Sequence, residues 1–163
     1  MRTRDDKKQE ALYLATIKLV NEIGFASCSV AKIAKEAKVS SATLYIYFKN
    51  KEDLLVSTYV EIKSSMVMET LADFEEDLPL HDLLHRVWRN TFDYVAKNRE
   101  EFRYTEQFAN SPFVDLVDKS QIETLFKPFI RAIERGIKQK IIKDVGLEVI
   151  GAFLFHPILF LAN

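Results

Sequence analysis

The chain has 163 residues, of which 48% are hydrophobic, and this is enough to build the core of one or two small domains. Its formal net charge of −1 excludes a chain that is basic throughout, and the single cysteine, Cys28, excludes an intrachain disulfide and fits a reducing cytosol. Residues 1–55 hold ten Lys/Arg against seven Asp/Glu, whereas residues 56–163 hold thirteen against seventeen. We therefore expect a mildly basic head, suited to nucleic acid, on an acidic body.

The first predicted helix covers residues 9–23, because its apolar residues recur at helical spacing from Leu12 to Ile23. Gly24 follows directly and is expected to end the helix, since glycine accepts the left-handed backbone found at helix C-termini. Phe25 is expected to pack back onto the same helix.

Two short helices, residues 30–37 and 41–48, are predicted next, each with apolar or small residues on one face. Ser29 and Ser40 stand directly before them and are good N-caps. Only a short break that begins at Lys38 separates the two helices. Two short helices joined by a turn of a few residues describe a helix-turn-helix.

The second of these helices has the side chains that a major-groove reader needs. It begins with the small residues 41–43, which would let its N-terminal turn approach the base edges. Ile46 could touch a thymine methyl group, and Tyr47 could donate a phenol hydrogen bond to a phosphate. Tyr45 could do the same, or its ring could pack on the first helix of the head instead.

Residues 33–55, IAKEAKVSSATLYIYFKNKEDLL, resemble the DNA-binding signature of the TetR family of bacterial repressors. The resemblance covers about the first third of the chain, and it implies that helix 9–23 braces the reading helices. The matching pieces, in order, are Ile33-Ala34, Val39-Ser40, Thr43-Leu44-Tyr45, Tyr47-Phe48, Asn50-Lys51 and Asp53-Leu54-Leu55.

One position departs from the family pattern, which usually has glycine in the turn where this chain has Lys38. A left-handed backbone costs a residue with a side chain on the order of 1 kcal/mol. Two alternatives follow: either the turn is of another type, or Lys38 bears this strain.

A further helix is expected to begin after Asn50, which is a good N-cap, with Asp53 at its third position as in a capping box. Lys51 then lies at a helix N-terminus, where a phosphate is favoured, and the resemblance implies a contact with the DNA backbone. The complete set of predicted DNA contacts is Ser29, Lys32, Ser40, Ser41, Ala42, Thr43, Tyr45, Ile46, Tyr47 and Lys51.

The rest of the chain is predicted to be helical as well, so the expected fold class is all-α. Its domains are a three-helix helix-turn-helix head, residues 1–50, and a helical ligand-binding and dimerisation body, residues 51–163. Two alternatives remain for the C-terminus of the body: either it is truncated, or the chain is a short variant whose interface uses residues 147–162 alone. Pro128 is expected to kink or restart the fourth of the helices in the body. These helices are predicted at residues 51–75, 80–97, 100–108, 113–139 and 147–162.

An enzyme is not expected. His81 and His85, four residues apart on a helix, resemble half of a zinc site, but no third ligand or glutamate base accompanies them. No nucleophile triad, glycine-rich phosphate loop or pair of cysteines is present. We therefore predict no catalytic residue, no metal and no cofactor.

The body is rich in aromatic residues, most of which must form an ordinary core. The resemblance implies a ligand cavity there, a homodimer formed by the last helices, and release from a palindromic DNA operator when a small apolar or aromatic effector binds. The alternative is a DNA-binding protein that answers to a protein partner or to no small molecule. The polar N-terminus and the absence of an uninterrupted apolar span predict a cytoplasmic protein without a membrane segment. The predicted walls of the cavity are Met66, Trp88, Phe92, Phe108, Phe126 and Phe155.

Overall fold

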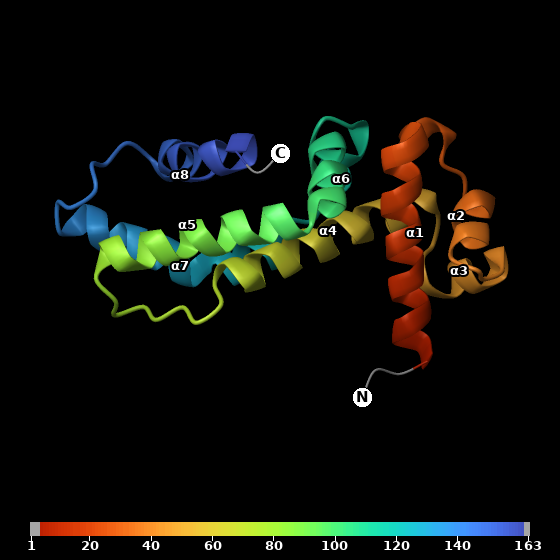
Figure 1. The fold of residues 1–163 in the computed structure, drawn as a ribbon, viewed down its shortest axis with the longest axis horizontal. Helices are drawn as coiled ribbons and strands as arrows, with labels where there is room; N and C mark the ends of the chain where they lie inside the picture. The colour runs from red at the N-terminus through yellow and green to blue at the C-terminus, as the bar shows by residue number, and fades with distance from the viewer. Residues whose placement is uncertain (1–3, 162–163) are drawn as a thin grey trace. The chain divides into compact units, whose positions relative to one another are not determined.

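The computed structural model describes residues 4–161, and every regular element in that range is helical (Figure 1). The all-α fold class expected from the sequence is confirmed. The predicted end of the last helix at Ala162 lies outside the described residues. The elements are α1 (Arg4–Ser27), α2 (Val30–Glu36), α3 (Ser41–Tyr47), α4 (Lys51–Thr70), α5 (Leu80–Lys97), α6 (Arg99–Ala109), the short 3-10 helix η1 (Pro112–Leu116), α7 (Ser120–Lys138) and α8 (Leu147–Leu161).

The chain folds as two compact units that do not follow one another in sequence. The first unit combines the residues up to Ile62 with residues 100–117, so that it holds α1, α2, α3, the first part of α4, nearly all of α6 and η1. The second unit combines residues 63–99 with residues from Asp118 onward. These units are defined by packing, and the boundary between a DNA-binding and a ligand-binding domain at residue 50 stays a prediction.

The core of the first unit joins helices that are distant in sequence. Phe108 from α6 is fully buried and stacks on Tyr59 of α4 with 4.4 Å between ring centroids. Phe25 meets Phe108 and Phe113 edge-on or tilted, at 6.0 and 5.5 Å. Phe25, near the end of α1, therefore packs on α6 and η1, which the sequence did not indicate.

Tyr104 fastens α6 to α4 inside the same core. Its ring is fully buried, and its hydroxyl donates a 2.8 Å hydrogen bond to the backbone oxygen of Leu55. Burial raises the pKa of Tyr104 far above its ordinary value, so the phenol stays protonated and remains a donor. A buried phenol that finds such a partner avoids the cost of an unsatisfied polar group.

The backbone of α1 breaks at Gly24, which has φ 75° and ψ 165°. This left-handed conformation costs glycine nothing and supports the prediction that the regular helix ends there. The remaining turn, up to Ser27, leads into α2. The N-terminal start at Arg4 is earlier than the predicted start at Gln9, since polar residues add a solvated turn to the helix.

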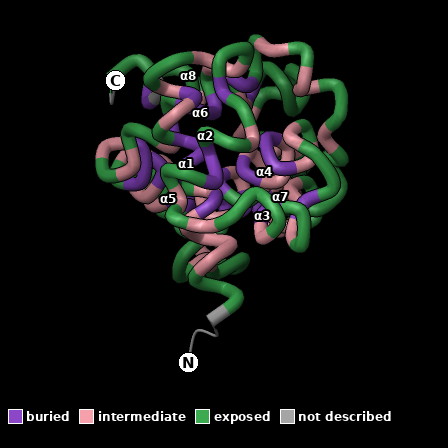
Figure 2. The backbone as a smooth tube through the Cα atoms, turned by 90° about the vertical axis from the view of Figure 1, so that its right-hand side faces the viewer, coloured by how far each residue is buried: buried purple, intermediate pink, exposed green. Residues whose placement is uncertain are grey.

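In the second unit, α5 contacts both α7 and α8. The face of α5 that carries Leu83 and Val87 packs against Phe129 and Ile133 of α7 in one apolar cluster. Figure 2 shows the pattern along the chain: buried stretches are short and alternate with exposed ones, as expected for amphipathic helices. Thr70 and Thr91 share a buried hydrogen bond of 3.1 Å, which joins the end of α4 to α5.

The end of α4 and the course of α7 also differ from what was expected. The helix α4 ends at Thr70 rather than near Glu75, because Asp73 takes a left-handed backbone, φ 56°, and turns the chain. Pro128 lies inside α7 without ending it. A proline inside a helix costs about 3 kcal/mol, but α7 buries Phe129, Ala132 and Ile133 along one face, which offsets that cost.

Candidate functional site

Both short helices of the predicted helix-turn-helix begin with the expected caps. The Ser29 hydroxyl accepts the backbone N–H of Lys32 at 3.3 Å. The Ser40 hydroxyl accepts the backbone N–H of Thr43 at 3.0 Å and lies 2.9 Å from the Thr43 hydroxyl. Each cap satisfies a backbone donor that a helix start leaves without an internal partner.

The turn between α2 and α3 has the left-handed residue that one of the two alternatives required. Lys38 has φ 57°, its N–H bonds the oxygen of Lys35 at 3.1 Å, and the N–H of Val39 bonds the oxygen of Ala34 at 2.9 Å. These two bonds are those of a Schellman motif, which normally has glycine in the left-handed position. Lys38 therefore bears the strain, and its side chain is exposed.

The helix α3 has one buried face and one open face. Leu44 and Phe48 are 0% and 3% exposed and anchor it to the core. On the other side Tyr45 is 55% exposed and Ile46 77%, and Ser41 is also open to solvent. This face of α3 is therefore free to contact another molecule.

The lysine at the start of α4 already has a partner within the first unit. Lys51 Nζ donates a 2.7 Å hydrogen bond to the backbone oxygen of Phe25, and Lys32 Nζ donates one of 3.0 Å to the oxygen of Ser27. Both lysines thus satisfy carbonyl groups at the end of α1. The sequence could not show these contacts, because they join residues that come together only through the fold.

The predicted cap of α4 is present in modified form. The Asn50 side chain accepts the N–H of Asp53 at 2.7 Å, and Asp53 accepts the N–H of Lys49 at 2.8 Å. In a regular capping box the second bond would come from the N–H of Asn50 itself. The start of α4, and with it Lys51, is nevertheless fixed by local bonds.

Tyr47 makes a contact that the sequence did not indicate. Its hydroxyl donates a 3.1 Å hydrogen bond to Asp5 in the first turn of α1. Burial and the Asp5 carboxylate both raise the pKa of Tyr47, so its phenol remains a donor. Any phosphate that binds Tyr47 must therefore take the place of a carboxylate.

The predicted cavity walls do not all meet. Phe126 and Phe155 lie 6.0 Å apart and line an apolar pocket of about 250 Å³ between α7 and α8. Trp88 and Phe92 stack on one another along α5, at 5.8 Å.

Two other predicted walls lie elsewhere. Met66 is half-buried on α4, and Phe108 belongs to the core of the first unit. The role of all six residues in binding a ligand stays a prediction.

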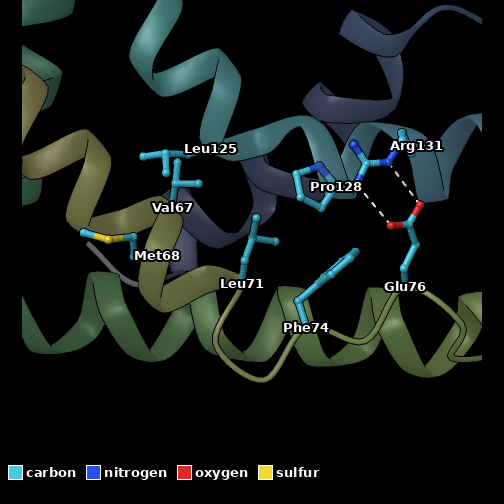
Figure 3. A pocket seen from close by; sticks show the side chains of 8 residues that line it. All are labelled: Val67, Met68, Leu71, Phe74, Glu76, Leu125, Pro128 and Arg131. Carbon is cyan, nitrogen blue, oxygen red and sulfur yellow. Dashed lines mark hydrogen bonds and ion pairs between the residues drawn. The ribbon is translucent and has the colours of Figure 1, made fainter.

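A second, larger groove of about 470 Å³ lies in the second unit between the end of α4, the following loop and α7 (Figure 3). Its apolar walls include Leu71, Phe74 and Pro128, and Arg131 and Glu76 stand together at one end. None of the residues that line it was among the predicted cavity walls.

The loop between α4 and α5 is held by long side chains from two helices. Arg131 and Arg135 of α7 reach Glu76, the first through its carboxylate and the second through its backbone oxygen. From α5, Arg86 donates to the oxygen of Asp73, and Asn90 donates to backbone oxygens nearby. These donors satisfy carbonyl groups of a loop that has no secondary structure.

Among residues 4–161 we find neither a membrane-spanning helix nor a cluster of metal-binding side chains. No helix in this range is long and apolar enough to cross a membrane. In the same range no three His, Cys, Asp or Glu side chains are close enough to hold a metal ion, and a ring nitrogen of His81 lies 3.1 Å from a carboxylate oxygen of Asp82.

Comparison with known proteins finds similarity to one family. The family model described as bacterial regulatory proteins, tetR family, matches residues 12–58. The solved structure of a TetR family transcription regulator from Marinobacter aquaeolei VT8 is 35% identical, with a TM-score of 0.84 over 99% of this chain and 85% of that one.

Two curated proteins are also similar. An uncharacterised HTH-type transcriptional regulator of Haemophilus influenzae is 33% identical over 113 residues, and the match covers 69% of this chain but only 60% of that protein. The fatty acid metabolism regulator protein of Bacillus subtilis is 28% identical over 139 residues, which cover 83% of this chain and 70% of that protein.

Proposed function

The chain belongs to the TetR family of bacterial regulatory proteins, which are DNA-binding transcriptional regulators and not enzymes, and we propose that it is a dimeric, cytoplasmic repressor released from a palindromic operator by a small apolar ligand. The observation that carries the proposal is the open face of α3. Its exposed Ile46 stands opposite the buried Leu44, and Ser41 and Tyr45 are also open to solvent, so the helix is anchored on one side and free to enter a major groove on the other.

The neighbouring caps support this role. Ser40 fixes the start of α3, and Lys51 stands at the start of α4 with two ammonium hydrogens beyond the one it gives to Phe25. A phosphate at that helix start would meet free backbone N–H groups and a positive charge. Tyr47 would join it by exchanging Asp5 for a phosphate oxygen.

The helix α8 supports a homodimer. Phe153 and Phe160 are 80% and 86% exposed, and Val149 and Leu161 are also open to solvent. An exposed apolar surface of this kind usually marks an interface. A second copy with the same face would bury it by a two-fold contact, and two α3 helices would then read the two halves of a palindrome.

The effector class follows from the aromatic pocket between α7 and α8 and from the relatives. The pocket is lined by Phe126, Phe129 and Phe155 and takes an apolar group. The Bacillus relative is a fatty acid metabolism regulator, so long-chain acyl compounds are the first effectors to test. Binding to a state in which the two heads no longer match the operator would release the DNA.

The test is fluorescence anisotropy with DNA from upstream of the coding region, beside a scrambled duplex, as salt is increased. We expect selective binding by a dimer, with affinity that falls steeply with salt. Lys51→Ala should weaken both duplexes and reduce the salt slope by about 1, while Lys143→Ala, an exposed lysine of the second unit, should change neither.

Two outcomes would contradict the proposal. Equal, weak binding of both duplexes by a confirmed dimer would mean that α3 reads no operator in this DNA. Selective binding that no acyl or aromatic compound relieves would favour the alternative, a DNA-binding protein that answers to a protein partner or to no ligand.

A further inference from the structure

The groove beside the α4–α5 loop has the two parts that an amphiphile needs. Its walls are largely apolar, formed by Val67 of α4, Leu71 and Phe74 of the following loop, and Leu125 and Pro128 of α7 (Figure 3). Its volume of about 470 Å³ lies within the 300–1,000 Å³ that is usual for ligand sites. A single alkyl chain can lie on such an apolar surface without a polar partner along its sides.

The polar end of the groove is already built to hold a carboxylate. Arg131 Nε and Nη2 donate to the two oxygens of Glu76, each at 3.1 Å, in the paired geometry that guanidinium and carboxylate groups prefer. The Arg131 side chain is 54% exposed and that of Glu76 46%, so water and solutes reach both. Within the described part of the chain, no hydrogen bond involves Arg131 Nη1.

The charge of the surrounding segment favours an anion. Residues 119–143, which contain α7, hold seven Lys/Arg and only two Glu, although residues 56–163 as a whole are acidic. Lys127 and Arg135 stand one turn on either side of Arg131, so all three lie on one face of α7. A cation placed on Glu76 would meet this row of positive charges, whereas an anion on Arg131 would be attracted by it.

We propose that this groove binds a free long-chain carboxylate, with its alkyl chain on the apolar walls and its carboxylate on Arg131 in place of Glu76. The ligand and Glu76 both present a carboxylate, so Arg131 can hold either one with the same pair of hydrogen bonds. Glu76 belongs to the loop that follows α4, and its release would remove one of the bonds that hold that loop to α7, while Arg135 keeps its bonds to the backbone oxygens of Glu76 and Leu78. The proposal rests on the proposed function only for its regulatory consequence, because binding itself needs no DNA.

The test is calorimetric titration of the full chain with dodecanoate below its micellar concentration. Arg131→Gln should weaken binding about tenfold, because a hydrogen-bonded charge is lost from the site. Glu76→Gln should tighten binding severalfold, because the competing carboxylate is removed. Because the two variants should change the affinity in opposite directions, a loss of folding common to both cannot explain the expected result.

Three controls accompany the variants. Arg86→Gln removes an arginine that holds the same loop but does not line the groove, and it should leave dodecanoate binding unchanged. Dodecanol and dodecyltrimethylammonium have the same chain with no charge and with a positive charge, and both should bind more weakly than dodecanoate.

The proposal is overturned if dodecyltrimethylammonium binds more tightly, if Arg131→Gln binds dodecanoate as the wild type does, or if Glu76→Gln weakens it. Its failure is distinct from that of the proposed function. If dodecanoate binds with the expected variant effects but leaves the DNA complex intact, the groove is a binding site for carboxylates but its ligand is not the effector that releases DNA. If dodecanoate releases DNA equally well from the Arg131→Gln variant, dodecanoate is an effector but binds at another site.

Discussion

In the first unit the short helices α2 and α3 are capped by the side chains that stand directly before them. In the second unit, in contrast, the loop after α4 is held by side chains that come from helices later in the chain. Ser29 and Ser40 bond backbone groups three residues away. Glu76, in contrast, is held by Arg131, 55 residues later. This difference shows that the starts of α2 and α3 are specified locally, while the shape of the body depends on how its helices meet.

The largest effect is expected where the first unit departs from this rule, at Phe108 of α6. Phe108→Ala should lower the free energy of unfolding by about 3–5 kcal/mol, because a fully buried ring is lost from the core. Phe126→Ala, at a half-buried ring in the second unit, should cost less. Urea denaturation followed by circular dichroism measures both. If Phe108→Ala kept its stability and lost only its response to ligand, Phe108 would be a cavity wall, as first predicted.

The next effect concerns a local cap. Ser40→Ala should cost about 1 kcal/mol of stability, since the N–H of Thr43 loses its acceptor at the start of α3. Its neighbour Ser41 is exposed, so Ser41→Ala should change stability by less than about 0.5 kcal/mol and act on DNA binding alone. Equal losses of stability in both variants would show that Ser40 does not act as a cap.

This contrast explains which features could be predicted from the sequence. The caps at Ser29, Ser40 and Asn50 and the all-α fold followed from residues within a few positions of one another. The bond from Tyr47 to Asp5 and that from Tyr104 to Leu55 span 42 and 49 residues, and no local pattern contains them. For the same reason the predicted cavity walls, chosen for their aromatic character, were found at several separate places.

A smaller effect is expected at the turn between α2 and α3. Lys38→Gly should relieve a left-handed strain of about 1–2 kcal/mol, but glycine also gains about 0.5–1 kcal/mol of freedom in the unfolded chain. The net result should be a gain of up to about 1.5 kcal/mol, seen as a higher Tm. Lys38→Ala keeps the strain and should change little. A loss of stability in Lys38→Gly would mean that the lysine side chain stabilises the turn.

The smallest effect is expected at two carboxylates of the second unit. One of them is held by a neighbouring residue and the other by a residue distant in the sequence. The N–H of Ser120 lowers the pKa of Asp118, two residues away, and Arg131 lowers the pKa of Glu76. A lowered pKa means that the stability each group adds is complete above its ordinary pKa and is lost as the pH falls through the folded value.

An NMR titration of the two carboxyl groups tests whether their pKa values have separate causes. In Arg131→Gln the pKa of Glu76 should return toward its ordinary value, because the guanidinium is its main cause. The pKa of Asp118 should stay low, since its donor is the backbone of the adjoining turn and does not depend on α7 meeting the loop. If both values rose together, the start of α7 would depend on the clamp, and local and distant contacts in this unit would form one cooperative structure.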